Sequence, residues 1–247
     1  MNNDEMLKSI ALNYHLSGLP DIHIENAIQR YELDWLHALI PMGSRVLDLG
    51  IGDGIIFQEL VEFIGNSGGG LVTVEGSQDI VEKFSHLESS YVQIICSRFE
   101  DLSINDGFDV ILASHVLEHV DDPVTLLTNL NSLLKVNGVL VGVVPNRESL
   151  HRRVAVAMGI QDELDSLSAR DHMVGHQRVY SLVSLVSDLD KAGFEIDSHR
   201  GFFVKPLANS QMLDFSVELI RGLLVASDDL PTELCGNIGF VASKTMA

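Results

Sequence analysis

Short apolar runs alternate with amphipathic segments along most of this chain. The runs are short, rich in β-branched residues and largely apolar at consecutive positions: 45–49, 71–75, 91–96, 108–113 and 139–144. Consecutive apolar positions are typical of strands that are covered by helices on both faces. The repeated strand–helix–strand order therefore predicts a doubly wound α/β fold with a parallel sheet.

The segments between these runs show the three-to-four-residue spacing of helices. An apolar stripe over residues 24–39 predicts the first helix. The helix before the last run begins with Asp122 as its cap and Pro123 in its first turn, and Asn137-Gly138 is expected to end it. Later in the chain we expect helices over 181–192 and 211–226 and strands over 194–198 and 237–243.

Composition narrows the classes of partner. The chain has 16 basic and 35 acidic residues, a formal net charge of −19, which repels phosphate backbones and anionic lipids. We therefore expect neither nucleic acid nor a membrane as partner. The N-terminus lacks the pattern of a signal peptide, and no apolar stretch reaches the roughly 18 residues of a membrane span. Cys96 and Cys235 are expected to be buried packing residues in a soluble, cytoplasmic protein.

A glycine-rich turn follows the first predicted strand, in the segment Asp48-Leu49-Gly50-Ile51-Gly52-Asp53-Gly54. Glycines let the backbone take positive φ and approach a ligand closely, and the helix that follows points its first N–H groups at it. The second predicted strand ends in Glu75, whose carboxylate can accept hydrogen bonds from both hydroxyls of a ribose. Together these features predict a cofactor that contains a nucleoside.

Two cofactor classes fit such a turn. A dinucleotide requires the spacing G-x-G-x-x-G, but position 55 is Ile55. Asp48 also lies where the charge of a pyrophosphate would be, and a zwitterionic amino-acid tail tolerates this carboxylate better. The pattern therefore favours a nucleoside cofactor with an amino-acid tail over a dinucleotide. A nucleotide-dependent oxidoreductase is the alternative enzyme, and a non-catalytic cofactor-binding module is the third possibility.

The motifs resemble those of class I S-adenosylmethionine-dependent methyltransferases. The matching segments, within residues 44–145, are 46–54, 74–76, 108–111, 115–123 and 134–140. The resemblance implies a Rossmann-like sheet of seven strands with the last one antiparallel, and S-adenosylhomocysteine as product. It implies a cofactor site formed by Asp48, Gly50, Gly52, Asp53, Gly54, Glu75, Gly76, Ser77, Phe99, Glu100 and Ser114. Ser97-Arg98 replaces the usual acidic residue after the third strand, so Phe99 or Glu100 is assigned the adenine contact.

The resemblance also suggests how the chain is organised. We expect a single domain over residues 1–247, with an N-terminal helical cap at 1–40 and a cofactor-binding core at 44–145. A helical insertion at 146–180 lies on the acceptor side, and residues 181–247 complete the sheet. Segments 145–153 and 201–206 resemble a bacterial subgroup associated with sugar, surface-polysaccharide or secondary-metabolite pathways.

Histidines are the candidate catalytic residues. Methyl transfer to a hydroxyl requires alignment and removal of a proton, which suits an imidazole. His115 and His119 follow the fourth predicted strand, whereas His172 and His176 lie in the insertion and are the preferred general bases. No metal is expected at His172 and His176, because Gly175 interrupts the helix and a third ligand is missing.

The sequence thus predicts transfer of a methyl group to a small-molecule acceptor. The acceptor atom is expected to be an oxygen, of glycosyl or natural-product type, with N-methylation of a small amine as the alternative. The acceptor's identity and the oligomeric state do not follow from the sequence.

Overall fold

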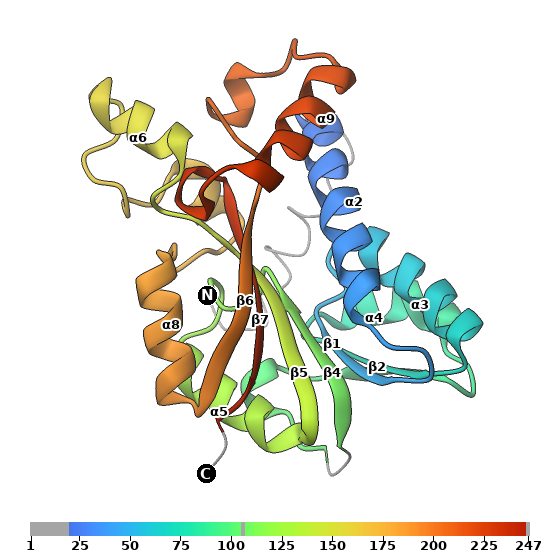
Figure 1. Ribbon diagram of the computed structural model, residues 1–247. Coiled ribbons are helices and arrows are strands. Elements are labelled where there is room, and N and C mark those ends of the chain that lie inside the picture. The colour runs from blue at the N-terminus through green and yellow to red at the C-terminus, as the bar shows by residue number, and fades with distance from the viewer. Residues whose placement is uncertain (1–19, 105–106, 246–247) are drawn as a thin grey trace.

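The computed structural model describes residues 20–104 and 107–245, and seven strands within them form one sheet (Figure 1). The strands are β1 (Arg45–Leu49), β2 (Gly70–Glu75), β3 (Val92–Cys96), β4 (Phe108–Ser114), β5 (Leu134–Pro145), β6 (Phe194–Phe202) and β7 (Asn237–Lys244). Their order is β3-β2-β1-β4-β5-β7-β6. Strands β1 to β5 pair in parallel, and β7 is antiparallel to both of its neighbours. The predicted Rossmann-like sheet with an antiparallel last strand is confirmed.

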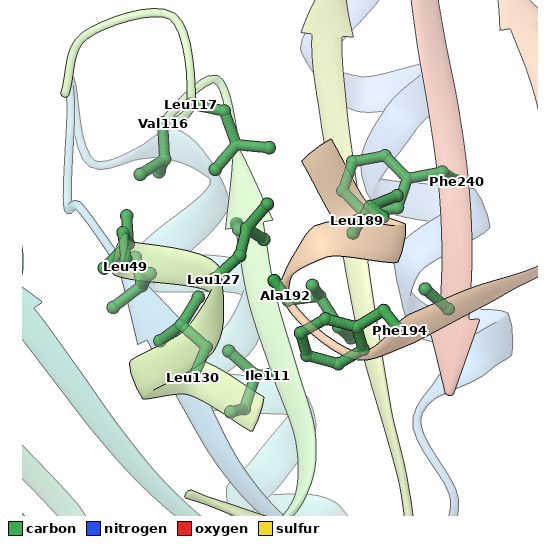
Figure 2. Close-up of a cluster of buried hydrophobic side chains, with 14 of the residues drawn as sticks. Leu49, Ile111, Val116, Leu117, Leu127, Leu130, Leu189, Ala192, Phe194 and Phe240 are labelled. Carbon is green, nitrogen blue, oxygen red and sulfur yellow. The ribbon is translucent and has the colours of Figure 1, made fainter. Parts of the chain in front are cut away.

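Helices cover both faces of this sheet (Figure 1). The α-helices of the described residues are α2 (Ile22–Leu39), α3 (Ile55–Ser67), α4 (Gln78–Phe84), α5 (Pro123–Leu133), α6 (Leu150–Ala157), α7 (Ala169–Met173), α8 (Leu182–Lys191) and α9 (Val217–Ala226). Leu127 of α5 and Leu189 of α8 belong to the core of one face (Figure 2), and α2, α3 and α4 fill the core of the other. Leu47 faces the first core and Val46 the second, so consecutive strand residues must both be apolar.

The helices α2 and α9 pack against each other through a third apolar cluster. Ile24 and Ile28 of α2 and Ile220 and Leu224 of α9 belong to this cluster, together with Phe203. Parallel strands end at one edge of a sheet, where ligands bind in this class of fold. The third cluster holds α2 beside that edge, so that the helix supplies one wall of the site described below.

The predicted end of the helix that begins at Pro123 was wrong. The helix expected to end at Asn137-Gly138 ends at Leu133, because Leu134 is buried in the core and already pairs with Phe108 of β4. Gly138 lies inside β5, where a Cβ atom would come within 2.8 Å of the Phe108 carbonyl oxygen. The glycine therefore permits close strand approach and does not end the helix.

Cys96 is exposed, contrary to expectation, because β3 is an edge strand, whereas Cys235 is buried as expected. Asp122 caps α5 by accepting a hydrogen bond from the Thr125 backbone N–H at 3.0 Å, as predicted. The first 19 residues of the predicted N-terminal cap lie outside the described residues. No helix in the described ranges has the length and apolar character that a membrane span needs.

Candidate functional site

The loop between β1 and α3 forms the floor of a cavity. Gly50 and Gly52 adopt φ angles of 92° and 58°, in the left-handed region that favours glycine. Both residues line a cavity of about 450 Å³, which lies in the size range of small-molecule sites. Gly54 also has a positive φ but does not line the cavity. A Cβ atom there would lie 2.1 Å from the Phe84 ring, so Gly54 serves the packing of α3 on α4.

Glu75, at the end of β2, connects this loop to the next one. Its Oε2 accepts a hydrogen bond from the Ile51 backbone N–H at 3.0 Å, and its Oε1 accepts one from the Ser77 backbone N–H at 2.8 Å. Burial raises the pKa of the carboxyl group, although these backbone hydrogen bonds oppose the shift. Each carboxylate oxygen has a further acceptor site. Glu75 therefore positions two loops and can still receive two hydroxyl groups.

Asp48, one residue before the end of β1, has an unsatisfied carboxylate oxygen. The side chain is 5% exposed, and Oδ2 has no hydrogen-bond partner among the residues the structure describes. Burial raises the pKa of Asp48 to about 8. A buried acceptor at a cavity wall without a partner suits a ligand that brings its own donors. An ammonium group fits this position, and a pyrophosphate does not.

The cavity gathers almost the whole predicted cofactor site. Ten of the eleven residues line it: Asp48, Gly50, Gly52, Asp53, Glu75, Gly76, Ser77, Phe99, Glu100 and Ser114. Gln29 of α2 reaches across and donates a hydrogen bond to Asp53 at 3.1 Å. The β-strand ends and α2 thus enclose a space that suits a nucleoside carrying an amino-acid tail.

Asp48 predicts an unusual pH dependence of stability. In the unfolded chain an aspartate ionises near pH 4, as a rough value, whereas the folded protein keeps this proton to about pH 8. Between these values the folded state binds more protons, so the free energy of unfolding falls as the pH rises. Asp48→Asn removes this loss and should stabilise the ligand-free protein, by about 3 kcal/mol more at pH 7.5 than at pH 5. Urea denaturation at both pH values measures this difference, and an equal effect at both would contradict it.

His115 also lines the cavity and joins two buried carboxylates. Its Nε2 lies 3.3 Å from Glu32 Oε2, and its Nδ1 lies 3.2 Å from Glu118 Oε1. Both glutamate side chains are 0% exposed. Burial alone would lower the pKa of His115, but the two carboxylates raise it well above its ordinary value. His115 is therefore an imidazolium at neutral pH and has no free site with which to accept a proton.

His119 and His176 form a neighbouring pair of imidazoles that both line the cavity. Their ring centroids are 4.8 Å apart with an interplanar angle of 70°. Burial lowers the pKa of His119, which keeps its ring neutral at pH 7. The structure places His172 differently: its side chain is exposed and does not line the cavity.

Asp171 holds His176 in place. Its Oδ1 accepts from His176 Nδ1 at 2.9 Å, and its Oδ2 accepts from Arg152 Nη2 at 2.9 Å and from the Ser168 hydroxyl at 2.7 Å. Burial alone would raise the pKa of Asp171, but these partners hold it well below its usual range. An ionised Asp171 keeps the proton on His176 Nδ1 and turns Nε2 toward Glu118.

Sequence reasoning missed Glu32 and Glu118. Glu32 had a detectable signal: Glu25, Gln29 and Glu32 recur at the spacing of one helix face, beside the apolar stripe of α2, and all three line the cavity. Glu118 is fully buried inside the turn after β4; it belongs to the matching segment 115–123, but no role was predicted for it from the sequence.

Comparisons with known proteins identify the family of this chain. The chain matches a family model described as a methyltransferase domain over residues 24–199. A ubiquinone biosynthesis O-methyltransferase of Actinobacillus pleuropneumoniae serotype 7 is 27% identical over 204 residues, which cover 79% of this chain and 84% of that protein.

Solved structures share the fold at low sequence identity. The S-adenosylmethionine-dependent methyltransferase from Mesorhizobium loti gives a TM-score of 0.63 at 16% identity, covering 86% of this chain and 97% of that one. The 1,6-didemethyltoxoflavin-N1-methyltransferase from Burkholderia thailandensis, with bound 1,6-didemethyltoxoflavin and S-adenosylhomocysteine, gives 0.57 at 17% identity, covering 89% and 79%. Because the family model spans more than half of the chain, the protein belongs to this methyltransferase family and is an S-adenosylmethionine-dependent methyltransferase.

Proposed function

We propose that this enzyme methylates an oxygen atom of a small-molecule acceptor. In this proposal Glu75 receives the ribose hydroxyls of S-adenosylmethionine and Asp48 receives its ammonium group. Gly50 and Gly52 line the methionine side, and Phe99 and Glu100 flank the adenine. When bound, the cofactor supplies an electrophilic methyl group on a positively charged sulfur.

The pair of imidazoles at the proposed acceptor end of the cavity is the observation that favours oxygen as the acceptor atom. A hydroxyl group is protonated at neutral pH and must lose its proton as its oxygen attacks, whereas a neutral amine needs little such help. His119 and His176 face the cavity together, and Asp171 holds His176 at 2.9 Å. We assign to this pair the preparation of the acceptor oxygen.

The resemblance to O-methyltransferases supports the same choice. The relative from Actinobacillus pleuropneumoniae is matched over 84% of its length, so the likeness includes the segment that follows β5 as well as the cofactor loop. The net charge of −19 further favours an acceptor that is not a polyanion. Membership of the methyltransferase family argues against the oxidoreductase alternative.

A matched panel of acceptors tests the proposal. Radiolabelled methyl transfer from S-adenosylmethionine should be measured with phenols and sugar alcohols and with the amines of the same skeletons. We expect turnover with hydroxyl compounds. His119→Ala and His176→Ala should each lower kcat about 100-fold, at the low end of the effect of losing a base, because one imidazole remains.

The exposed His86 and His172 provide the controls, since neither lines the cavity. His86→Ala and His172→Ala should keep the wild-type rate, and all four variants should bind S-adenosylhomocysteine normally. Methylation of the amines alone, with unchanged rates in His119→Ala and His176→Ala, would overturn the assignment of oxygen as the acceptor atom.

A further inference from the structure

Three potential metal ligands converge at the acceptor end of the cavity. Glu118, His119 and His176 each offer one ligand atom, and these atoms all lie within 4.8 Å of one another. Glu118 and His119 lie in the turn after β4, and His176 follows α7. Two imidazoles and one carboxylate form a ligand set typical of catalytic zinc sites, in which a fourth position stays open for water or substrate.

The carboxylate has an unused oxygen at this point. Glu118 is 0% exposed, and its Oε1 interacts with His115 at 3.2 Å. Within the described part of the chain, its Oε2 is buried and has no hydrogen-bond partner. A buried, unpartnered carboxylate oxygen is costly, because its loss of hydration is not compensated. A cation bound at Oε2 would remove this cost.

Both imidazoles are oriented by groups behind them, as metal-binding histidines usually are. His176 donates through Nδ1 to Asp171 at 2.9 Å, which leaves Nε2 facing Glu118. The separation of 3.9 Å between Nε2 and Glu118 Oε1 is too long for a hydrogen bond. The ring of His119 hydrogen-bonds to the backbone of Gly175. These contacts fix which ring nitrogen of His176 can bind a ligand.

We propose that Glu118, His119 and His176 bind a divalent transition-metal ion, with Zn²⁺ the occupant that their chemistry favours, and that the open position of this ion holds the acceptor hydroxyl. The inference rests on the proposed O-methyltransferase function and specifies how the imidazole pair acts. Ligand atoms of a tetrahedral zinc site lie roughly 3.4 Å apart. The observed separations, all within 4.8 Å, must therefore shorten by up to about 1.4 Å, which side-chain rotations supply.

Such an ion would act on the acceptor as a Lewis acid. Coordination lowers the pKa of a bound hydroxyl group, so the hydroxyl releases its proton to solvent through the cavity mouth. The oxygen then bonds to the methyl carbon while the carbon–sulfur bond breaks. Sulfur keeps that electron pair, which yields the methyl ether, S-adenosylhomocysteine and one proton. No oxidant or reductant is needed, because the ion keeps its charge.

Cobalt binding tests the site without any methyl transfer. Untagged protein is treated with a chelator, freed of it and titrated with Co²⁺, whose visible absorption reports its ligands. We expect one ion per chain with a Kd in the micromolar range or below, displaced by Zn²⁺. Glu118→Gln, His119→Ala and His176→Ala should each weaken binding at least tenfold. His86→Ala, which changes an exposed histidine, should not.

Each variant's thermal midpoint and affinity for S-adenosylhomocysteine show whether it is folded. Absence of saturable Co²⁺ binding, or equal binding by Glu118→Gln and the wild type, would overturn the metal site. Methylation of hydroxyl acceptors at an unchanged rate after metal removal would overturn the ion's role and leave the proposed function intact. Co²⁺ binding that all three ligand variants weaken, in a protein that methylates amines alone, would instead overturn O-methylation.

Discussion

Replacing Glu75 with alanine is expected to weaken the binding of S-adenosylmethionine and S-adenosylhomocysteine at least 100-fold. In the proposed complex the Glu75 oxygens receive the ribose hydroxyls, and in the structure they accept hydrogen bonds from the backbone N–H groups of Ile51 and Ser77 at 3.0 Å and 2.8 Å. Loss of two hydrogen bonds to a charged acceptor costs about 3 kcal/mol or more, which is a factor of at least 100 in Kd.

Calorimetric titration with both sulfur compounds measures this effect, and two variants separate its causes. Glu75→Gln keeps the shape and one acceptor oxygen, so its loss should be intermediate. Glu62→Ala removes an exposed carboxylate from α3 outside the cavity and should leave Kd unchanged. A Glu75→Ala protein that binds within threefold of the wild type would show that the ribose lies elsewhere.

The part of the cavity that we assign to the cofactor was predictable because local sequence determines it. The positive φ angles at Gly50 and Gly52 require glycine, and the turn follows a strand whose apolar run is visible in the sequence. Glu75 ends the neighbouring strand β2, which pairs in parallel with β1. Parallel pairing brings the two strand ends together without any long-range information, so a linear motif was sufficient.

The part of the cavity that we assign to the acceptor depends on contacts between distant residues, and the sequence did not reveal them. His115 meets Glu32, which lies 83 positions earlier on α2, and His176 meets Glu118. The His172–His176 spacing suggested one helix face, but α7 ends at Met173 and Gly175 has a φ of 81°. The chain turns there, leaving His172 exposed and directing His176 to Asp171. A four-residue spacing indicates a shared face only if the helix continues.

His115→Asn is expected to destabilise the folded protein by about 3 kcal/mol at pH 7. Breaking a buried ion pair by removing one partner typically costs about 3–5 kcal/mol, and the low end applies because 32% of the His115 side chain is exposed. Asparagine tolerates the left-handed backbone at this position, where φ is 55°. The substitution therefore removes the charge without adding backbone strain, and Glu32 and Glu118 lose their common cation.

The pH dependence of this stabilisation follows from the direction in which the pKa of His115 is shifted. The carboxylates of Glu32 and Glu118 raise the pKa of His115. The contribution of His115 to the free energy of unfolding is therefore complete below its pKa in the unfolded chain, about 6.5. This contribution is lost as the pH rises through the pKa of His115 in the folded protein. In His115→Asn the pKa of Glu118, which the imidazolium holds down against burial, should rise. The variant should therefore recover stability as the pH falls toward 5, and urea denaturation at pH 5 and 7 measures this recovery.

A double-mutant cycle with Glu32→Gln decides whether charge is the cause. If the imidazolium stabilises the fold by neutralising buried carboxylates, Glu32→Gln should cost less in the His115→Asn protein than in the wild type, or even stabilise it. Strict additivity would mean that His115 contributes packing alone. Coupling would show that the charge of the His115 imidazolium stabilises the buried carboxylate of Glu32 on α2. The helix that forms the cavity wall would then be tied to the sheet through His115.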